Sequence, residues 1–127
     1  MGAWGHHFNE NDDAADWLAA FANSPSWSAC RNALAATEGD YVEAPEASTA
    51  LAAAEIVAAG IGHSNKRLAA EIVAWALGEE SAARSLVPQA VAAVTRVRDN
   101  SELQELWEES DSASWHASIA ALLGRLI

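Results

Sequence analysis

The sequence has little positive charge. Seven Lys and Arg residues stand against 18 Asp and Glu residues in 127, which gives a formal net charge of −11. Proteins that track a phosphate backbone need clustered Lys and Arg, so this balance argues against a nucleic-acid partner and against anionic membrane surfaces. Any protein partner is expected to be basic or neutral. The alternative is that the acidity only keeps an alanine-rich chain in solution.

Cysteine and long hydrophobic runs are also scarce. The one cysteine, Cys30, excludes an internal disulfide and suits a reducing compartment. The longest near-continuous apolar run, residues 50–61, is too short to span a membrane and contains Glu55. No basic segment followed by an apolar stretch marks a signal peptide, and we expect no targeting segment ahead of Met1. The expected location is therefore cytoplasmic.

Alanine is the most abundant residue, with 31 of the 127 positions, whereas proline occurs only three times. This composition favours helix. We predict an all-α single domain over residues 1–127: an ordered N-terminal loop at 1–10 and a bundle of six or seven short helices at 11–127. Apolar spacing and capping residues place one helix ending at about residue 23, three at about 26–37, 45–59 and 81–99, and one that ends before Gly78. A sixth has Leu103, Leu106 and Trp107 on its apolar face, and the last has Trp115, Ile119, Leu122 and Leu126.

Several helix ends carry specific signals. Asn11 or Asp12 caps the first helix, Ser101 and Gln104 have capping-box spacing, and Asp111 or Ser112 caps the last helix. Ser64 or Asn65 is expected to cap the fourth. In the fifth, Pro88 either splits the helix or marks a late first turn. Two stripes are candidates for its core-facing side: Val87, Val91, Val94 and Arg98, or the fully apolar Leu86, Ala90, Val94 and Val97.

The N-terminal block departs from this helical composition. It reads Met1-Gly-Ala-Trp-Gly5, then Phe8, Asn-Asp-Asp-Ala at 11–14 and Asp16-Trp17. The block resembles a bacterial family known only as domain of unknown function family 4259, and residues 50–59 and 99–107 are similar to it as well. The pair of histidines directly before Phe8 departs from the family pattern. The resemblance supports the fold class and implies no particular activity, substrate or cofactor.

The same block brings two histidines and three aspartates close together in sequence. His6, His7, Asp12, Asp13 and Asp16 offer imidazole and carboxylate ligands that suit a divalent metal. Aspartates in a first turn are more simply explained by capping and by the helix dipole, and adjacent histidines point in different directions. We therefore expect neither a metal site nor a cofactor. Five of the six Trp residues have core spacing, whereas Trp4 lies on the loop and is expected to pin it to the bundle.

Glu55 is the most unusual acid in the chain. It lies inside the run Ala-Leu-Ala-Ala-Ala-Glu-Ile-Val-Ala-Ala, and a Glu is almost never fully buried unless it is paired. We expect either a raised pKa or a specific partner. One interpretation is a pocket acid or base. The favoured interpretation is structural, with Glu55 accepting hydrogen bonds from the N-terminal loop.

The break at residues 99–102 is the remaining candidate site. Asn100 and Glu102 suit a ligand amine or a basic side chain, although such a string more often ends one helix and caps the next. The thiol of Cys30 beside Arg31 is expected to be a small buried hydrophobe. No phosphate-binding glycine loop, Cys-x-x-Cys motif or nucleophile elbow is present, which argues against an enzyme.

The leading functional hypothesis is a non-enzymatic protein-binding domain, an immunity- or antitoxin-type inhibitor of a basic partner. Its expected contact residues are the acids Glu79, Glu80, Glu105, Glu108, Glu109 and Asp111. The second hypothesis is a small-molecule or metal-binding domain, or an enzyme, with its site where the N-terminal loop meets Glu55 and the 99–102 break. The third is a structural subunit of a homo-oligomer.

Overall fold

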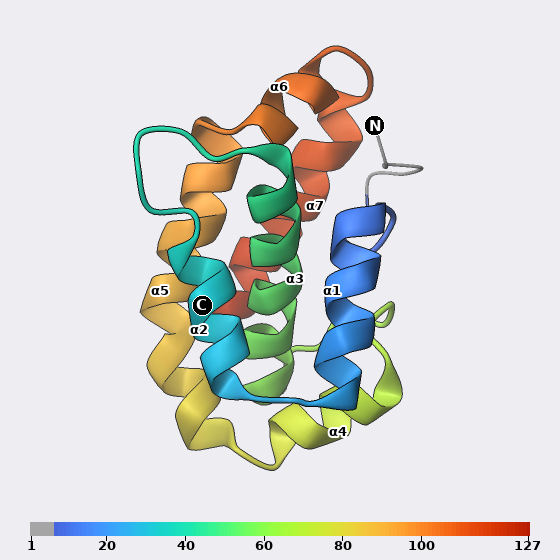
Figure 1. Cartoon of the computed structure of the whole chain (residues 1–127), viewed down its shortest axis with the longest axis vertical. Coiled ribbons are helices and arrows are strands. Elements are labelled where there is room, and N and C mark those ends of the chain that lie inside the picture. The colour runs from blue at the N-terminus through green and yellow to red at the C-terminus, as the bar shows by residue number, and fades with distance from the viewer. Residues whose placement is uncertain (1–6) are drawn as a thin grey trace.

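The computed structural model describes residues 7–127, and these residues form seven helices and no strand beyond one isolated bridge. The helices are α1 (Asp12–Asn23), α2 (Trp27–Ala35), α3 (Ala44–Gly60), α4 (Ala70–Leu77), α5 (Glu80–Asp99), α6 (Glu102–Glu108) and α7 (Ser112–Leu126) (Figure 1). The expected all-α fold class is confirmed. Residues 7–10 form a turn before α1, whereas Trp4, His6 and the rest of the expected loop lie outside the described residues.

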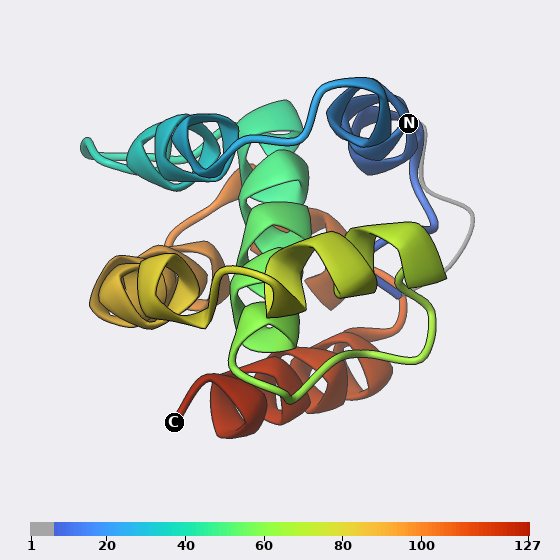
Figure 2. The same ribbon diagram turned by 90° about the horizontal axis from the view of Figure 1, so that it is seen from below.

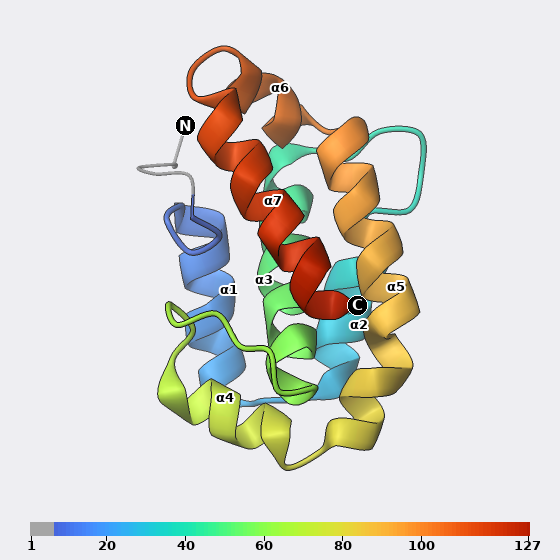
Figure 3. The same cartoon turned by 180° about the vertical axis from the view of Figure 1, so that it is seen from behind.

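Helix α3 is the centre of the bundle. Its sequence is apolar on every face, and every residue from Ala50 to Gly60 is buried. The other six helices all contact it, and Figures 2 and 3 show them arranged around it from below and from behind. Among the described helices, α3 included, none is long and apolar enough to cross a membrane.

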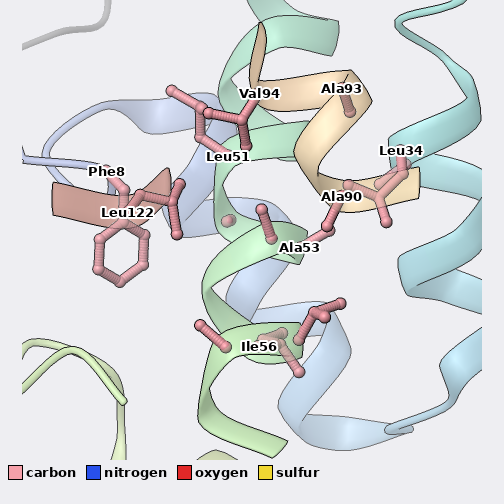
Figure 4. Packing of buried hydrophobic residues seen from close by; sticks show 14 of the residues in the cluster. Phe8, Leu34, Leu51, Ala53, Ile56, Ala90, Ala93, Val94 and Leu122 are labelled. Atoms are coloured by element: carbon pink, nitrogen blue, oxygen red, sulfur yellow. The ribbon is translucent and has the colours of Figure 1, made fainter. Parts of the chain in front are cut away.

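Small residues on α3 let its neighbours approach closely, and larger side chains from those neighbours fill the space between. Leu34 of α2, Val94 of α5 and Leu122 of α7 all meet α3 in the core, together with Phe8 from the N-terminal turn (Figure 4). Each fully buried Leu or Val side chain contributes about 1.5–3 kcal/mol to folding. Phe8 thereby ties the N-terminal turn to the bundle.

Side-chain caps set most of the helix starts. Asn11 accepts a hydrogen bond from the N–H of Ala14 at 2.8 Å, which begins α1. The Ser101 hydroxyl accepts from the N–H of Gln104 at 3.0 Å at the start of α6. The Asp111 carboxylate accepts from the N–H of Ser114 at 3.4 Å at the start of α7. The predicted caps at these three residues are confirmed.

Helix α4 begins later than the predicted caps at Ser64 or Asn65 imply. Neither Ser64 nor Asn65 caps it, because Asn65 uses its side-chain oxygen to accept from the N–H of Arg67 and its amide to donate to Glu55. These contacts hold a turn, and α4 begins only at Ala70. The loop before α4 is therefore longer than expected.

A split of the fifth helix at Pro88 is also wrong. Helix α5 runs without a break from Glu80 to Asp99. Proline costs one backbone hydrogen bond there, but the helix packs on the core through both of its halves. The predicted stripe is fully buried: Leu86, Ala90, Val94 and Val97.

Candidate functional site

Glu55 is buried in the middle of α3, with 3% of its surface exposed. Its partner is Arg125, near the end of α7, whose Nη2 lies 2.6 Å from Oε1 and 2.7 Å from Oε2. Asn65, from the turn before α4, donates to Oε2 at 3.2 Å. The prediction that Glu55 needs a specific partner is therefore correct, but its donors in the described chain come from α7 and the α3–α4 loop rather than from the N-terminal turn.

Burial raises the pKa of Glu55 above its ordinary value, and this effect outweighs the lowering by the charge and hydrogen bonds of Arg125 and by the hydrogen bond of Asn65. The expectation of a raised pKa or a specific partner is met in both respects. The Arg125 side chain is 25% exposed, whereas that of Glu55 is 4% exposed, so the pair lies between the core and solvent.

A cavity of about 40 Å³ lies beside Glu55. Its polar lining residues are His7, Asn11, Glu55, Asn65 and Ser118. Its apolar walls come from the N-terminal turn, α3, α6 and α7: Phe8, Leu51, Leu103, Trp107, Trp115, Ile119 and Leu122. A water-sized group takes roughly 10–15 Å³ on this measure, so the cavity has room for about three.

A wider groove of about 390 Å³ opens next to this cavity. It runs between α7 and the loop before α4, and it shares His7, Asn65 and Ser118 with the cavity. The groove is otherwise lined by Lys66, Arg67, Ser114, Ala117, Ala121 and Arg125. Cavity and groove therefore lie next to each other, and we call the two together the hollow region.

The aspartates of the predicted N-terminal cluster do not join this region. Asp12, Asp13 and Asp16 are exposed on α1, and none of them lines the cavity or the groove. His7 does line both, and its Nε2 lies 3.8 Å from Oε1 of Glu10. Within residues 7–127, no three His, Cys, Asp or Glu side chains gather in a way that suits a metal ion.

The 99–102 break was expected to approach Glu55, and this is wrong. The Asn100 amide donates to the carbonyl of Asp40, and the N–H of Glu102 donates to the carbonyl of Val42 at 2.8 Å. The Glu102 carboxylate accepts from the N–H of Ala44 at 2.8 Å and so caps α3. The break thus ties the start of α6 to the start of α3.

These contacts bring two acidic segments together, residues 38–46 and 101–111. Neither segment contains Lys or Arg, and together they hold nine of the 18 acids of the chain. We call this region the acidic end: Glu38, Asp40, Glu43, Glu46, Glu102, Glu105, Glu108, Glu109 and Asp111. All of these are exposed except Glu102, which is half-buried. The nearby Arg98 is neutralised by Asp99, at 2.7 Å.

Tyr41 lies within the acidic end and is 44% exposed. Its hydroxyl donates to Oε2 of Glu105 at 2.8 Å. Partial burial, this hydrogen bond and the negative charges of Glu105, Glu102 and Glu43 raise the pKa of Tyr41 to about 12. The pKa of Tyr41 therefore depends in part on the negative charges around it.

The six acids predicted as contact residues do not form one surface. Glu105, Glu108, Glu109 and Asp111 belong to the acidic end and are exposed. Glu79 and Glu80 lie at the opposite end of α5, about 30 Å away along that helix. Glu80 is moreover paired with Arg84. These two acids are therefore not part of the acidic end.

The chain matches the model of a domain of unknown function, DUF4259, over residues 2–118. It belongs to the DUF4259 family. No curated protein and no solved structure gives a significant match. The family assignment confirms the resemblance carried by the N-terminal block.

The aromatic and thiol side chains of this DUF4259 domain are mainly structural. Trp115 is buried, and Trp17, Trp27, Trp75 and Trp107 pack partly buried against the core, as their spacing predicts. Cys30 is fully buried, and burial raises the pKa of its thiol to about 12. It is therefore not a reactive thiolate.

Sequence reasoning missed the cationic side of the hollow region. Arg125, Lys66 and Arg67 were not singled out, although a chain with only seven basic residues makes each of them informative. A usable signal for Arg125 is its place between Leu122 and Leu126 in residues 119–127, which are otherwise apolar. A lone cation there is the natural counterpart of a lone acid in α3.

Proposed function

We propose that this DUF4259 domain binds a basic protein through its acidic end and acts as an immunity- or antitoxin-type inhibitor of that partner. The single observation that carries the proposal is the concentration of half of the acids of the chain on one end, without Lys or Arg in either contributing segment. Burial of this acidic surface against a cationic one neutralises charge on both proteins.

The geometry of the acidic end supports a recognition surface rather than a merely solvated face. Backbone and side-chain hydrogen bonds between residues 40–44 and 100–102 hold its two segments together. Its acids are therefore presented on a fixed frame. The exposed ring of Tyr41 provides an aromatic anchor among them, a residue type enriched in protein interfaces.

An acidic surface of this kind affects mainly the rate at which the domain associates with a basic partner. Complementary charge raises association rates and disfavours acidic competitors, and salt weakens both effects. Occupying a cationic substrate-binding surface on the partner is enough to inhibit it, and this requires no catalytic group on the domain.

Two matched variants test the proposal by affinity capture from a lysate of the source organism. The acidic-end variant carries Glu38→Gln, Glu43→Gln and Glu109→Gln, and the control variant carries Asp16→Asn, Glu71→Gln and Glu79→Gln. All six side chains are exposed, and each variant loses three negative charges.

We expect the wild type and the control to capture the same basic protein at low salt and to release it at high salt, while the acidic-end variant captures much less. Mass spectrometry identifies and quantifies the captured protein. Equal capture by the two variants, or capture that salt does not weaken, contradicts the proposal.

A second candidate function is the binding of a small molecule in the cavity beside Glu55. The specific observation in its favour is a hollow with convergent polar groups, His7, Asn65 and Glu55, at the predicted junction of the N-terminal residues and α3. A ligand in this cavity is expected to raise the melting temperature and to shift the indole N–H resonances of Trp107 and Trp115. Ligands that stabilise the protein without moving these two resonances contradict it.

A further inference from the structure

We propose that the groove between α7 and the α3–α4 loop binds a small oxyanion, a carboxylate or a phosphate monoester, whose short apolar tail enters the Glu55 cavity. The inference deepens the second candidate function and rests on it, and it is independent of the acidic end. It assigns a charge and a size to the ligand.

The charge follows from the lining of the groove. Lys66, Arg67 and Arg125 are three of the seven basic residues of the chain, whereas none of the 18 acids lines the groove. Two acids contact residues that line the groove but do not line it themselves: Glu55 is paired with Arg125, and Glu10 lies beside His7. In a protein of net charge −11, this concentration of cations selects an anion.

Two of these cations are available to a ligand. Lys66 and Arg67 are exposed, and within residues 7–127 their side chains make no hydrogen bond or ion pair. Their backbone is nevertheless held in place, because the N–H of Arg67 donates to Asn65 at 2.9 Å and its carbonyl accepts from Asn9 at 3.5 Å. The loop therefore presents a guanidinium fork and an ammonium beside the hollow, the donors that bind carboxylate and phosphate oxygens.

The size of the tail follows from the inner cavity. His7, Asn65 and Ser118 line both the cavity and the groove, and the other cavity walls are mainly aromatic and aliphatic. A volume of about 40 Å³ accepts about three water-sized groups, whereas a cavity that takes benzene measures about 150 Å³. The tail is thus a chain of about three carbons rather than a ring.

Three probes with the same three-carbon tail test this assignment: butyrate, propyl phosphate and the neutral butyramide. Each is titrated into ¹⁵N-labelled protein and followed by two-dimensional NMR. We expect butyrate or propyl phosphate to bind about tenfold more tightly than butyramide. The anion is expected to shift the backbone amides of Lys66 and Arg67 and the indole resonances of Trp107 and Trp115.

A double variant, Lys66→Gln with Arg67→Gln, is expected to abolish this tenfold preference and to leave butyramide binding unchanged. The control with Arg31→Gln and Arg84→Gln removes two positive charges elsewhere and is expected to keep the preference. The affinities of butyrate and propyl phosphate, which differ only in head group, decide between a carboxylate and a phosphate.

Equal binding of butyramide and the anions overturns the inference but leaves the small-molecule function standing. Absence of binding by all three probes contradicts both. Anion binding that survives loss of Lys66 and Arg67, or that leaves both indoles unmoved, overturns the proposed placement of head and tail.

Discussion

At the scale of single residues, the Glu55–Arg125 pair is the most consequential contact in the molecule. It joins the central helix to the last one across 70 positions of sequence. The sequence predicts that Glu55 needs a partner, because a carboxylate among alanines is costly to bury. It does not identify Arg125, because the pairing depends on how α7 packs against α3, which no local pattern encodes.

Glu55→Gln tests the effect of burial on this carboxyl. Its pKa is raised above the ordinary value of 4.5, so the folded state holds the proton more tightly than the unfolded state. The resulting stabilisation is present below pH 4.5 and is lost as pH rises through the folded-state pKa. Urea unfolding at a series of pH values should therefore show the wild type losing stability relative to Glu55→Gln as pH rises toward neutrality. A difference that is constant with pH contradicts this.

Arg125→Gln removes the other partner and leaves a buried carboxylate held by Asn65 alone. We expect a loss of about 3 kcal/mol in unfolding free energy at neutral pH. The loss should shrink in acid, where Glu55 is protonated, and adding Glu55→Gln should recover most of it. A loss that is the same at both pH values would show that Arg125 acts through packing instead.

Tyr41 is the single tyrosine of the chain, so its ionisation can be followed by ultraviolet absorbance. The structure places its pKa at about 12, against an ordinary value of 10. Glu105→Gln removes both a hydrogen-bond acceptor and a charge, and it should lower that pKa toward 10. Glu79→Gln, at the other end of α5, serves as the control and should leave it unchanged. A wild-type value near 10 contradicts the electrostatic account of the acidic end.

At the scale of helices, close packing depends on small residues where α3 meets α5. A Cβ on Gly60 would lie 2.4 Å from Cβ of Ala83, which requires the helices to move apart. Gly60→Ala should therefore cost about 1–3 kcal/mol by overpacking, and Ala83→Gly should partly rescue it. Gly124→Ala is the matched control, because its Cβ meets nothing within 4 Å; we expect it to stabilise α7 by about 0.5–1 kcal/mol. Chemical denaturation checks both, and equal effects would contradict the packing account.

The sequence predicts the helices themselves well, but it predicts neither the start of α4 nor the continuity of α5. Apolar spacing and the caps at Asn11, Ser101 and Asp111 located α1, α6 and α7 because these signals are local. The start of α4 was misplaced because Asn65 serves a distant partner, Glu55, rather than its own helix. Helix α5 passes through Pro88 because its buried stripe holds both halves on the core.

At the scale of the whole molecule, charge is strongly segregated. The sequence gives the net charge of −11 but not its distribution. The acidic end forms because the bridge between Val42 and Ser101 brings segments some 60 residues apart side by side. The basic groove forms because α7 passes the loop before α4 (Figure 3). Both features depend on tertiary packing, which explains why the sequence does not separate Glu79 and Glu80 from the acids near α6.

The most direct test of the central claim is the association rate of the captured basic partner, measured against ionic strength for the wild type and the two charge variants. We predict that the acidic-end variant associates about tenfold more slowly at low salt, that the control matches the wild type, and that the three rates converge at high salt. Equal association rates for the two variants at low salt would contradict the proposal that the acidic end is the binding surface.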